Sequence, residues 1–130
     1  MTPLAASAMT EVRSLHAAFE DLFTGRRRDL DRCARAFASD FSMVAPDGSR
    51  RDRGAVLAAL GIAAASPDFH ISIKDLTPIW EAADSVLLQY VEEQYRDGET
   101  TRRLAVALFE TASHAPNGVA WRFLQETWIS

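Results

Sequence analysis

The fold of this chain is decided by residues 85–112, which read SVLLQYVEEQYRDGETTRRLAVALFETA. Two strand-like stretches flank Asp97-Gly98, a dipeptide typical of two-residue β-hairpin turns. With that turn, Glu93 lies opposite Arg102 and Glu92 lies opposite Arg103, so opposite charges face each other across the two strands. The stretch therefore predicts an antiparallel hairpin of defined register.

Both faces of this hairpin are rich in apolar side chains. One face is expected to carry Val86, Leu88, Tyr90, Glu92 and Gln94 beside Thr101, Arg103, Ala105, Ala107 and Phe109. The other is expected to carry Leu87, Gln89, Val91, Glu93 and Tyr95 beside Arg102, Leu104, Val106 and Leu108. An antiparallel sheet with one face in water should alternate cleanly, so each face here needs a cover. Helices can cover one face, and we expect a second copy of the chain to cover the other in a homodimer.

The segments around the hairpin complete an α+β pattern. Helical periodicity runs over residues 10–24, 30–38 and 53–65, with Asp29 and Asp52 as N-caps of the second and third helices. A short strand is expected over residues 41–45, and further strands start near Phe69 and cover residues 119–129. Helices first and an antiparallel meander afterwards predict three N-terminal helices gathered on one face of a mainly antiparallel sheet. Residues 1–9 are expected to be disordered and residues 10–130 to form one domain.

In the last strand, strict alternation turns Trp121 and Phe123 one way and Glu126 and Trp128 the other. We therefore expect Trp121 and Phe123 to suit a subunit interface.

Composition excludes several classes of protein. Of the 130 residues, 48% are hydrophobic and 25% are charged, as in ordinary globular proteins. The net charge of −4 disfavours nucleic acid as a partner. No 18-residue apolar run and no signal-peptide pattern occurs, which argues against a membrane anchor or export. The single cysteine, Cys33, fits a reducing compartment, so a cytoplasmic location is expected.

A pocket is expected on the hairpin face that carries Ala105 and Ala107. Above small side chains in mid-strand, either a helix comes close or a cavity is left, and polar side chains that share the same face favour a pocket. The residues expected to bind a ligand are Tyr90, Glu92, Gln94, Arg103, Glu126 and Trp128. The simpler interpretation of Glu92 is an ion pair with Arg103.

Cofactor and metal sites are not expected. The histidines His16, His70 and His114 stand on separate elements, with His16 interpreted as helix surface or core, and no phosphate-binding glycine loop or dinucleotide motif is present.

The helix order, the hairpin start at residues 41–48 and the closing stretch WRFLQETW at 121–128 resemble the nuclear transport factor 2-like superfamily, in particular its SnoaL-like branches with a cystatin-like fold. The resemblance covers roughly residues 10–130 and implies a cone-shaped domain, in which a strongly curved, mainly antiparallel sheet wraps around the three helices and leaves a cavity at the wide end. It also implies dimers through the sheet. Residues 125–128 resemble a His-Glu-Thr-Trp ending, but Gln125 replaces the histidine.

Three functions are compatible with this sequence, because members of the superfamily include enzymes as well as binding and assembly domains. The main hypothesis is a homodimer that binds a small, largely apolar molecule without a cofactor. The first alternative is an isomerase or cyclase of the ketosteroid isomerase or SnoaL type, in which Glu92 or Glu126 moves a proton and Tyr90 stabilises charge. The second alternative is a non-catalytic assembly module whose interior is filled.

Overall fold

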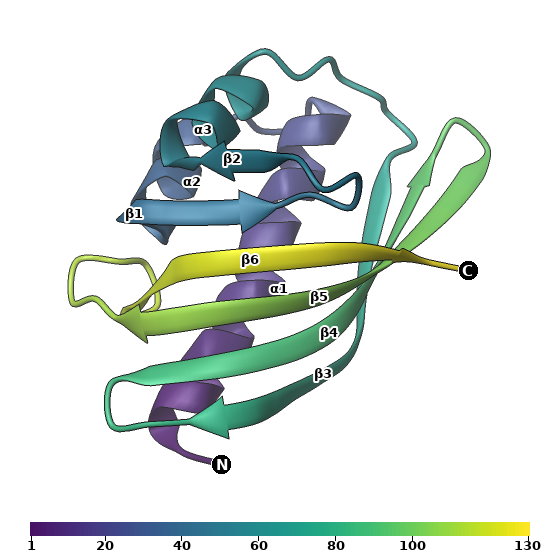
Figure 1. The fold of residues 1–130 in the computed structure, drawn as a ribbon. Helices are drawn as coiled ribbons and strands as arrows, with labels where there is room; N and C mark the ends of the chain where they lie inside the picture. The colour runs from purple at the N-terminus through teal and green to yellow at the C-terminus, as the bar shows by residue number, and fades with distance from the viewer.

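The computed structural model describes residues 1–130, which form three helices and six strands in an α+β arrangement (Figure 1). In chain order the elements are α1 (Pro3–Thr24), α2 (Leu30–Ala36), β1 (Phe37–Val44), β2 (Arg50–Asp52), α3 (Arg53–Gly61), β3 (His70–Glu81), β4 (Ser85–Arg96), β5 (Glu99–Thr111) and β6 (Val119–Ile129).

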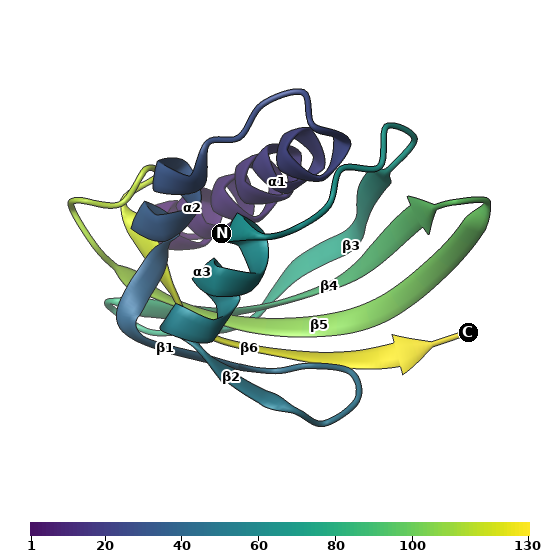
Figure 2. The same cartoon turned by 90° about the horizontal axis from the view of Figure 1, so that it is seen from above.

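The strands form a single sheet in the order β2-β1-β6-β5-β4-β3, antiparallel throughout except for the parallel pair β1 and β6. Figure 2 shows that the sheet curves around the helices, which all lie on its inner side. The predicted fold class is therefore confirmed, and the outer face of the sheet carries no element of this chain.

The central hairpin has the predicted register. Glu93 pairs with Arg102 and Glu92 with Arg103. Asp97 and Gly98 have φ angles of 52° and 82°, the left-handed values that a two-residue turn requires at both positions. The Asp-Gly dipeptide thus sets which side chains of β4 and β5 face the helices.

Helix α1 corrects the expectation that residues 1–9 are disordered. The helix begins at Pro3, and the Thr2 hydroxyl caps it by accepting a hydrogen bond of 3.1 Å from the Ala5 backbone N–H. Ala5 and Ala8 are fully buried. Alanines that pack closely against a sheet carry little apolar periodicity, so the first turns were missed.

The core lies between the helices and the inner face of the sheet. Its strand residues with no exposed surface are Val86, Leu88, Tyr90, Ala105, Ala107 and Phe109, all on the hairpin face that is expected to carry the pocket. Helix α1 packs over β3 and β4.

A β-bulge at Arg122 corrects the expected orientation of Trp121. Leu108 pairs with Phe123, but the next residue, Phe109, pairs with Trp121, so Arg122 is an extra residue in β6. The bulge turns Trp121 into the core, where it is 1% exposed, and leaves Phe123 on the outer face. Trp121 therefore cannot serve as an interface residue.

Neither α1 nor the two shorter helices combine the length and the apolar composition needed to cross a lipid bilayer.

Candidate functional site

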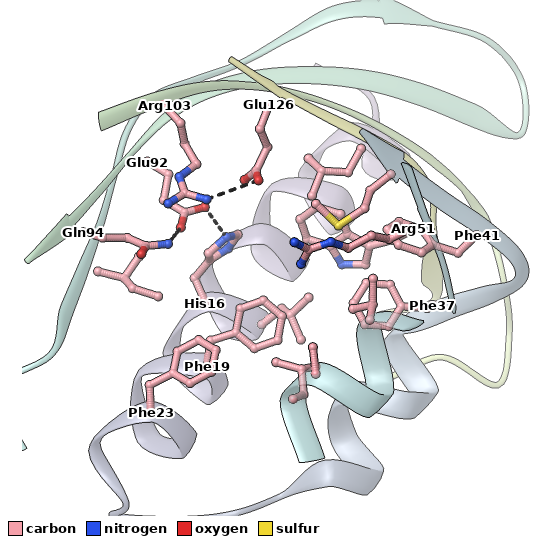
Figure 3. Close-up of a pocket in the computed structure, with 18 residues that line it drawn as sticks. His16, Phe19, Phe23, Phe37, Phe41, Arg51, Glu92, Gln94, Arg103 and Glu126 are labelled. Carbon is pink, nitrogen blue, oxygen red and sulfur yellow. Dashed lines mark hydrogen bonds and ion pairs between the residues drawn. The ribbon is translucent and has the colours of Figure 1, made fainter. Parts of the chain in front are cut away.

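A cavity of about 200 Å³ opens between the helices and the inner face of the sheet (Figure 3). Of its 18 lining residues, 12 are hydrophobic. The hydrophobic lining residues come from two helices and from several strands. They are Leu15, Phe19 and Phe23 of α1, Phe37, Phe41 and Met43 of β1, Val56, Ala59 and Leu60 of α3, and Ile71, Trp121 and Leu124 of the other strands. The polar lining residues are His16, Arg51, Glu92, Gln94, Arg103 and Glu126.

The register of three strands brings most of the polar groups together. Arg103 lies between Glu92 of β4 and Trp128 of β6, and Ala105 lies next to Glu126. Because alternate residues of a strand point to the same face, Arg103 and Glu126 are diagonal neighbours on the inner face. Glu92, Arg103 and Glu126 therefore gather on one side of the cavity, while Arg51 comes from the edge strand β2.

His16 and Glu92 form a buried pair at this polar end. His16 Nε2 lies 3.0 Å from Glu92 Oε1, and the two residues are 6% and 4% exposed. His16 Nδ1 donates to the Val12 carbonyl at 2.7 Å, and Gln94 Nε2 donates to the second oxygen of Glu92. Every polar atom of the pair thus has a partner, as a buried charge requires.

The protonation of this pair follows from its surroundings. Burial alone would raise the pKa of Glu92, but the charge and hydrogen bond of His16 outweigh it and lower that pKa to about 2. Burial alone would lower the pKa of His16, yet the charge of Glu92 and its hydrogen bond raise it above the ordinary 6.5. An imidazolium facing a carboxylate is the consistent state, because His16 then donates from both nitrogens.

Glu126 is the second carboxylate of the cavity. Arg103 Nη1 donates to Glu126 Oε1 at 3.3 Å, and the Arg103 guanidinium also stacks on the Trp128 ring, 4.7 Å from its centroid. Burial and the nearby charge of Glu92 raise the pKa of Glu126. Of the two buried acids, Glu126 is therefore the one that more readily holds a proton.

The expected ion pair between Glu92 and Arg103 does not form. Glu92 is the register neighbour of Arg103, but its hydrogen bonds come from His16 and Gln94, while Arg103 pairs with Glu126. Arg103 leans toward β6 because the Trp128 ring supports it there.

Only four of the six expected ligand-binding residues line the cavity. Glu92, Gln94, Arg103 and Glu126 line the cavity. Trp128 is half-exposed and lines an adjoining depression with Gln94 and Arg103. Tyr90 is fully buried outside the cavity lining, its ring edge-on to His16, and its hydroxyl has no hydrogen-bond partner. Burial, with the charges of Glu92 and Glu126, raises the pKa of Tyr90 well above 10.0.

Two polar residues of the cavity, His16 and Arg51, are not among the predicted ligand-binding residues. His16 stands on the apolar stripe of its helix beside Val12 and Phe19, and a histidine among buried positions is the signal that could have identified it. Arg51 comes from the short edge strand β2, and no sequence pattern pointed to it. Gln125, in contrast, pairs with Val106 on the outer face, so replacement of a histidine at this position does not alter the cavity.

No three His, Cys, Asp or Glu side chains are grouped so that they could hold a metal ion.

Comparisons with known proteins identify the fold. No family model and no curated protein matches the chain. Among solved structures, a nuclear transport factor 2-like protein of unknown function from Pseudomonas aeruginosa is 28% identical with a TM-score of 0.86, covering 95% of this chain and 99% of that chain. The CaMKII hub of S. rosetta is 10% identical with a TM-score of 0.80, covering 95% of each chain. A candidate ketosteroid isomerase from Parabacteroides distasonis is 9% identical with a TM-score of 0.63, covering 89% of this chain and 86% of that chain. The chain therefore has the nuclear transport factor 2-like fold that its sequence resembles.

Proposed function

We propose that this protein binds a small, largely apolar molecule in the cavity between its helices and its sheet. The observation that supports this most directly is the composition of the cavity wall, in which 12 of 18 residues are hydrophobic and five of the six polar residues, all except Arg51, form one cluster at the polar end. Ligand sites commonly combine such an apolar lining with a few converging polar groups.

The polar end is built to orient a ligand. Glu92 is held by His16 and Gln94, and Arg103 is held by Glu126 and Trp128, so these side chains have little freedom to rotate. Groups that are already ordered lose little entropy when a ligand contacts them. The apolar wall supplies affinity, and the polar end supplies orientation.

The test uses two neighbouring alanines of α3. Ala59 lines the cavity and Ala58 does not. We expect N-phenyl-1-naphthylamine, a neutral apolar fluorophore, to bind the unmodified protein and the Ala58→Trp variant, and to lose binding in Ala59→Trp because the indole fills the cavity. Native mass spectrometry of gently purified protein should also show a retained small molecule. Equal binding by both variants, or no binding and no retained molecule, would contradict the proposal.

An enzyme of the isomerase or cyclase type is the second candidate, and the state of Glu126 favours it. A general base needs a raised pKa and access to the substrate, and Glu126 has both, whereas Glu92 is held ionised by His16. Tyr90 does not reach the cavity wall, so the expected charge-stabilising role would fall to Arg103. Carbon-13 NMR titration of Glu126 tests this candidate, and an ordinary carboxylate pKa would contradict it.

We also propose that the protein is a homodimer through the outer face of its sheet. The side chains there include Leu87, Leu104, Val106, Leu108 and Phe123, all only partly buried in the single chain. Association alone, as in an assembly module with a filled interior, would not need the cavity beside Glu92.

A further inference from the structure

Arg51 is the one charged side chain of the cavity wall without a partner. Arg51 is an exposed residue of the edge strand β2, yet its side chain lines the cavity. Figure 3 shows its guanidinium group turned toward the middle of the cavity. No carboxylate lies within ion-pair distance of Arg51, and its side chain makes no hydrogen bond within the chain. The other cavity charges are matched, His16 with Glu92 and Arg103 with Glu126.

The cavity therefore carries an excess of positive charge. His16, Arg51 and Arg103 are its basic groups, and Glu92 and Glu126 are its acidic groups. Even with both acids ionised, no carboxylate of the cavity compensates the guanidinium of Arg51, whose charge acts only at longer range on Asp47 outside the cavity. An arginine cannot release its proton. Protonation of Glu126 would increase the positive excess.

This excess matters when a ligand displaces water. A neutral or cationic ligand would remove water from the Arg51 guanidinium without supplying a counter-charge, which is unfavourable beside apolar walls. A carboxylate would replace that water with two parallel N–H···O hydrogen bonds, because the planar guanidinium matches its geometry.

We propose that the ligand of this cavity is a carboxylic acid with an apolar body, bound as its anion, with the carboxylate on Arg51. This inference rests on the proposed function and specifies the ligand class. The body would lie against the aromatic residues Phe19, Phe37 and Phe41, which favours an aryl or short branched hydrocarbon group.

The experiment compares three probes of nearly equal shape by isothermal titration calorimetry: 3-phenylpropionate, 3-phenylpropionamide and 3-phenylpropylamine. Each is titrated into the unmodified protein and into Arg51→Gln, Arg51→Lys and Arg50→Gln. Arg50 precedes Arg51 on β2, is exposed and does not line the cavity, so Arg50→Gln removes the same charge without changing the wall.

We expect 3-phenylpropionate to bind at least tenfold more tightly than its amide, and the amine to bind most weakly. Arg51→Gln should abolish the preference for the acid, while Arg51→Lys should keep part of it and Arg50→Gln should keep it in full. Equal affinity for acid and amide would overturn this proposal but leave apolar ligand binding intact. The same loss in Arg50→Gln and Arg51→Gln would also overturn it, because net charge alone would then explain the preference. If none of the probes binds, the carboxylate proposal fails, and fluorophore binding in the Ala59→Trp experiment decides separately whether the proposed function fails too.

Discussion

His16 Nε2 lies 3.0 Å from Glu92 Oε1, a contact that ties α1 to β4 across 76 positions of the sequence. Because both residues are buried, the pair is shielded from water and from salt. Such pairs contribute little compared with well-packed apolar residues, but breaking one leaves a buried charge without a partner. The contact joins α1 to β4 at the polar end of the cavity, and the position of the helix there depends on both partners being present.

Removing only the histidine should destabilise the protein strongly. We expect His16→Leu to lower the free energy of unfolding by about 3–5 kcal/mol, because the Glu92 carboxylate stays buried without its main partner. The double variant His16→Leu with Glu92→Leu should recover much of that loss, since no unpaired charge remains. Urea denaturation at pH 6 measures both. Additive losses in the double variant would show that the two side chains are not coupled.

The same pair should give the protein a stability maximum in mildly acidic solution. Glu92 has a pKa lowered from 4.5 to about 2, so its contribution is present above pH 4.5 and is lost as the pH falls toward 2. His16 has a pKa raised above 6.5, so its contribution is complete below pH 6.5 and is lost as the pH rises through the folded value. Unfolding free energies measured from pH 3 to 9 should show this plateau between pH 4.5 and 6.5. The double leucine variant should have a flatter profile, and an unchanged profile would contradict the assignment.

The hydrogen bonds of Glu11 lead to a separate prediction, which concerns the stability of the protein and not ligand binding. This fully buried carboxylate accepts hydrogen bonds from Arg32 at 2.8 Å, Asn117 at 2.8 Å and Trp121 at 2.9 Å. We expect Glu11→Gln to lower the free energy of unfolding by about 3–5 kcal/mol, because the largely buried Arg32 side chain loses its counter-charge. Asp31→Asn is the control, since the Asp31–Arg35 pair is exposed and should have a far smaller effect. Similar losses in both variants would contradict a structural role for the Glu11 network.

The central hairpin could be predicted from sequence because its information is local. Asp97-Gly98 determines the turn, the turn determines the register, and the register assigns Glu92 and Arg103 to neighbouring positions on one face. The orientation of Trp121 could not be predicted in the same way. It depends on the bulge at Arg122, and an extra residue in a strand leaves no mark on the alternation of apolar and polar side chains.

The candidate site was predictable only as far as it lies on the strands β4, β5 and β6. Gln94, Arg103 and Glu126 follow from strand alternation and register. The partnership of His16 with Glu92 depends on how α1 crosses the sheet, which helical periodicity does not specify. Arg51 reaches the cavity only because β2 folds back along β1 at the edge of the sheet, so its role follows from tertiary structure alone.

The outer face of the sheet yields the last prediction. Val106 lies on that face between Gln89 and Gln125, surrounded by partly buried apolar side chains. If a second copy covers this face, Val106→Glu would place an unpaired charge within the interface, so we expect sedimentation velocity to show a dimer for the unmodified protein and a monomer for the variant. Thr100→Glu is the matched control: Thr100 is exposed on the same face of β5 but lies at the hairpin tip, so that variant should remain dimeric. Circular dichroism should show all three proteins folded, because Val106 is not part of the buried core. A monomeric unmodified protein at micromolar concentration would contradict the dimer and would leave the apolar outer face facing water.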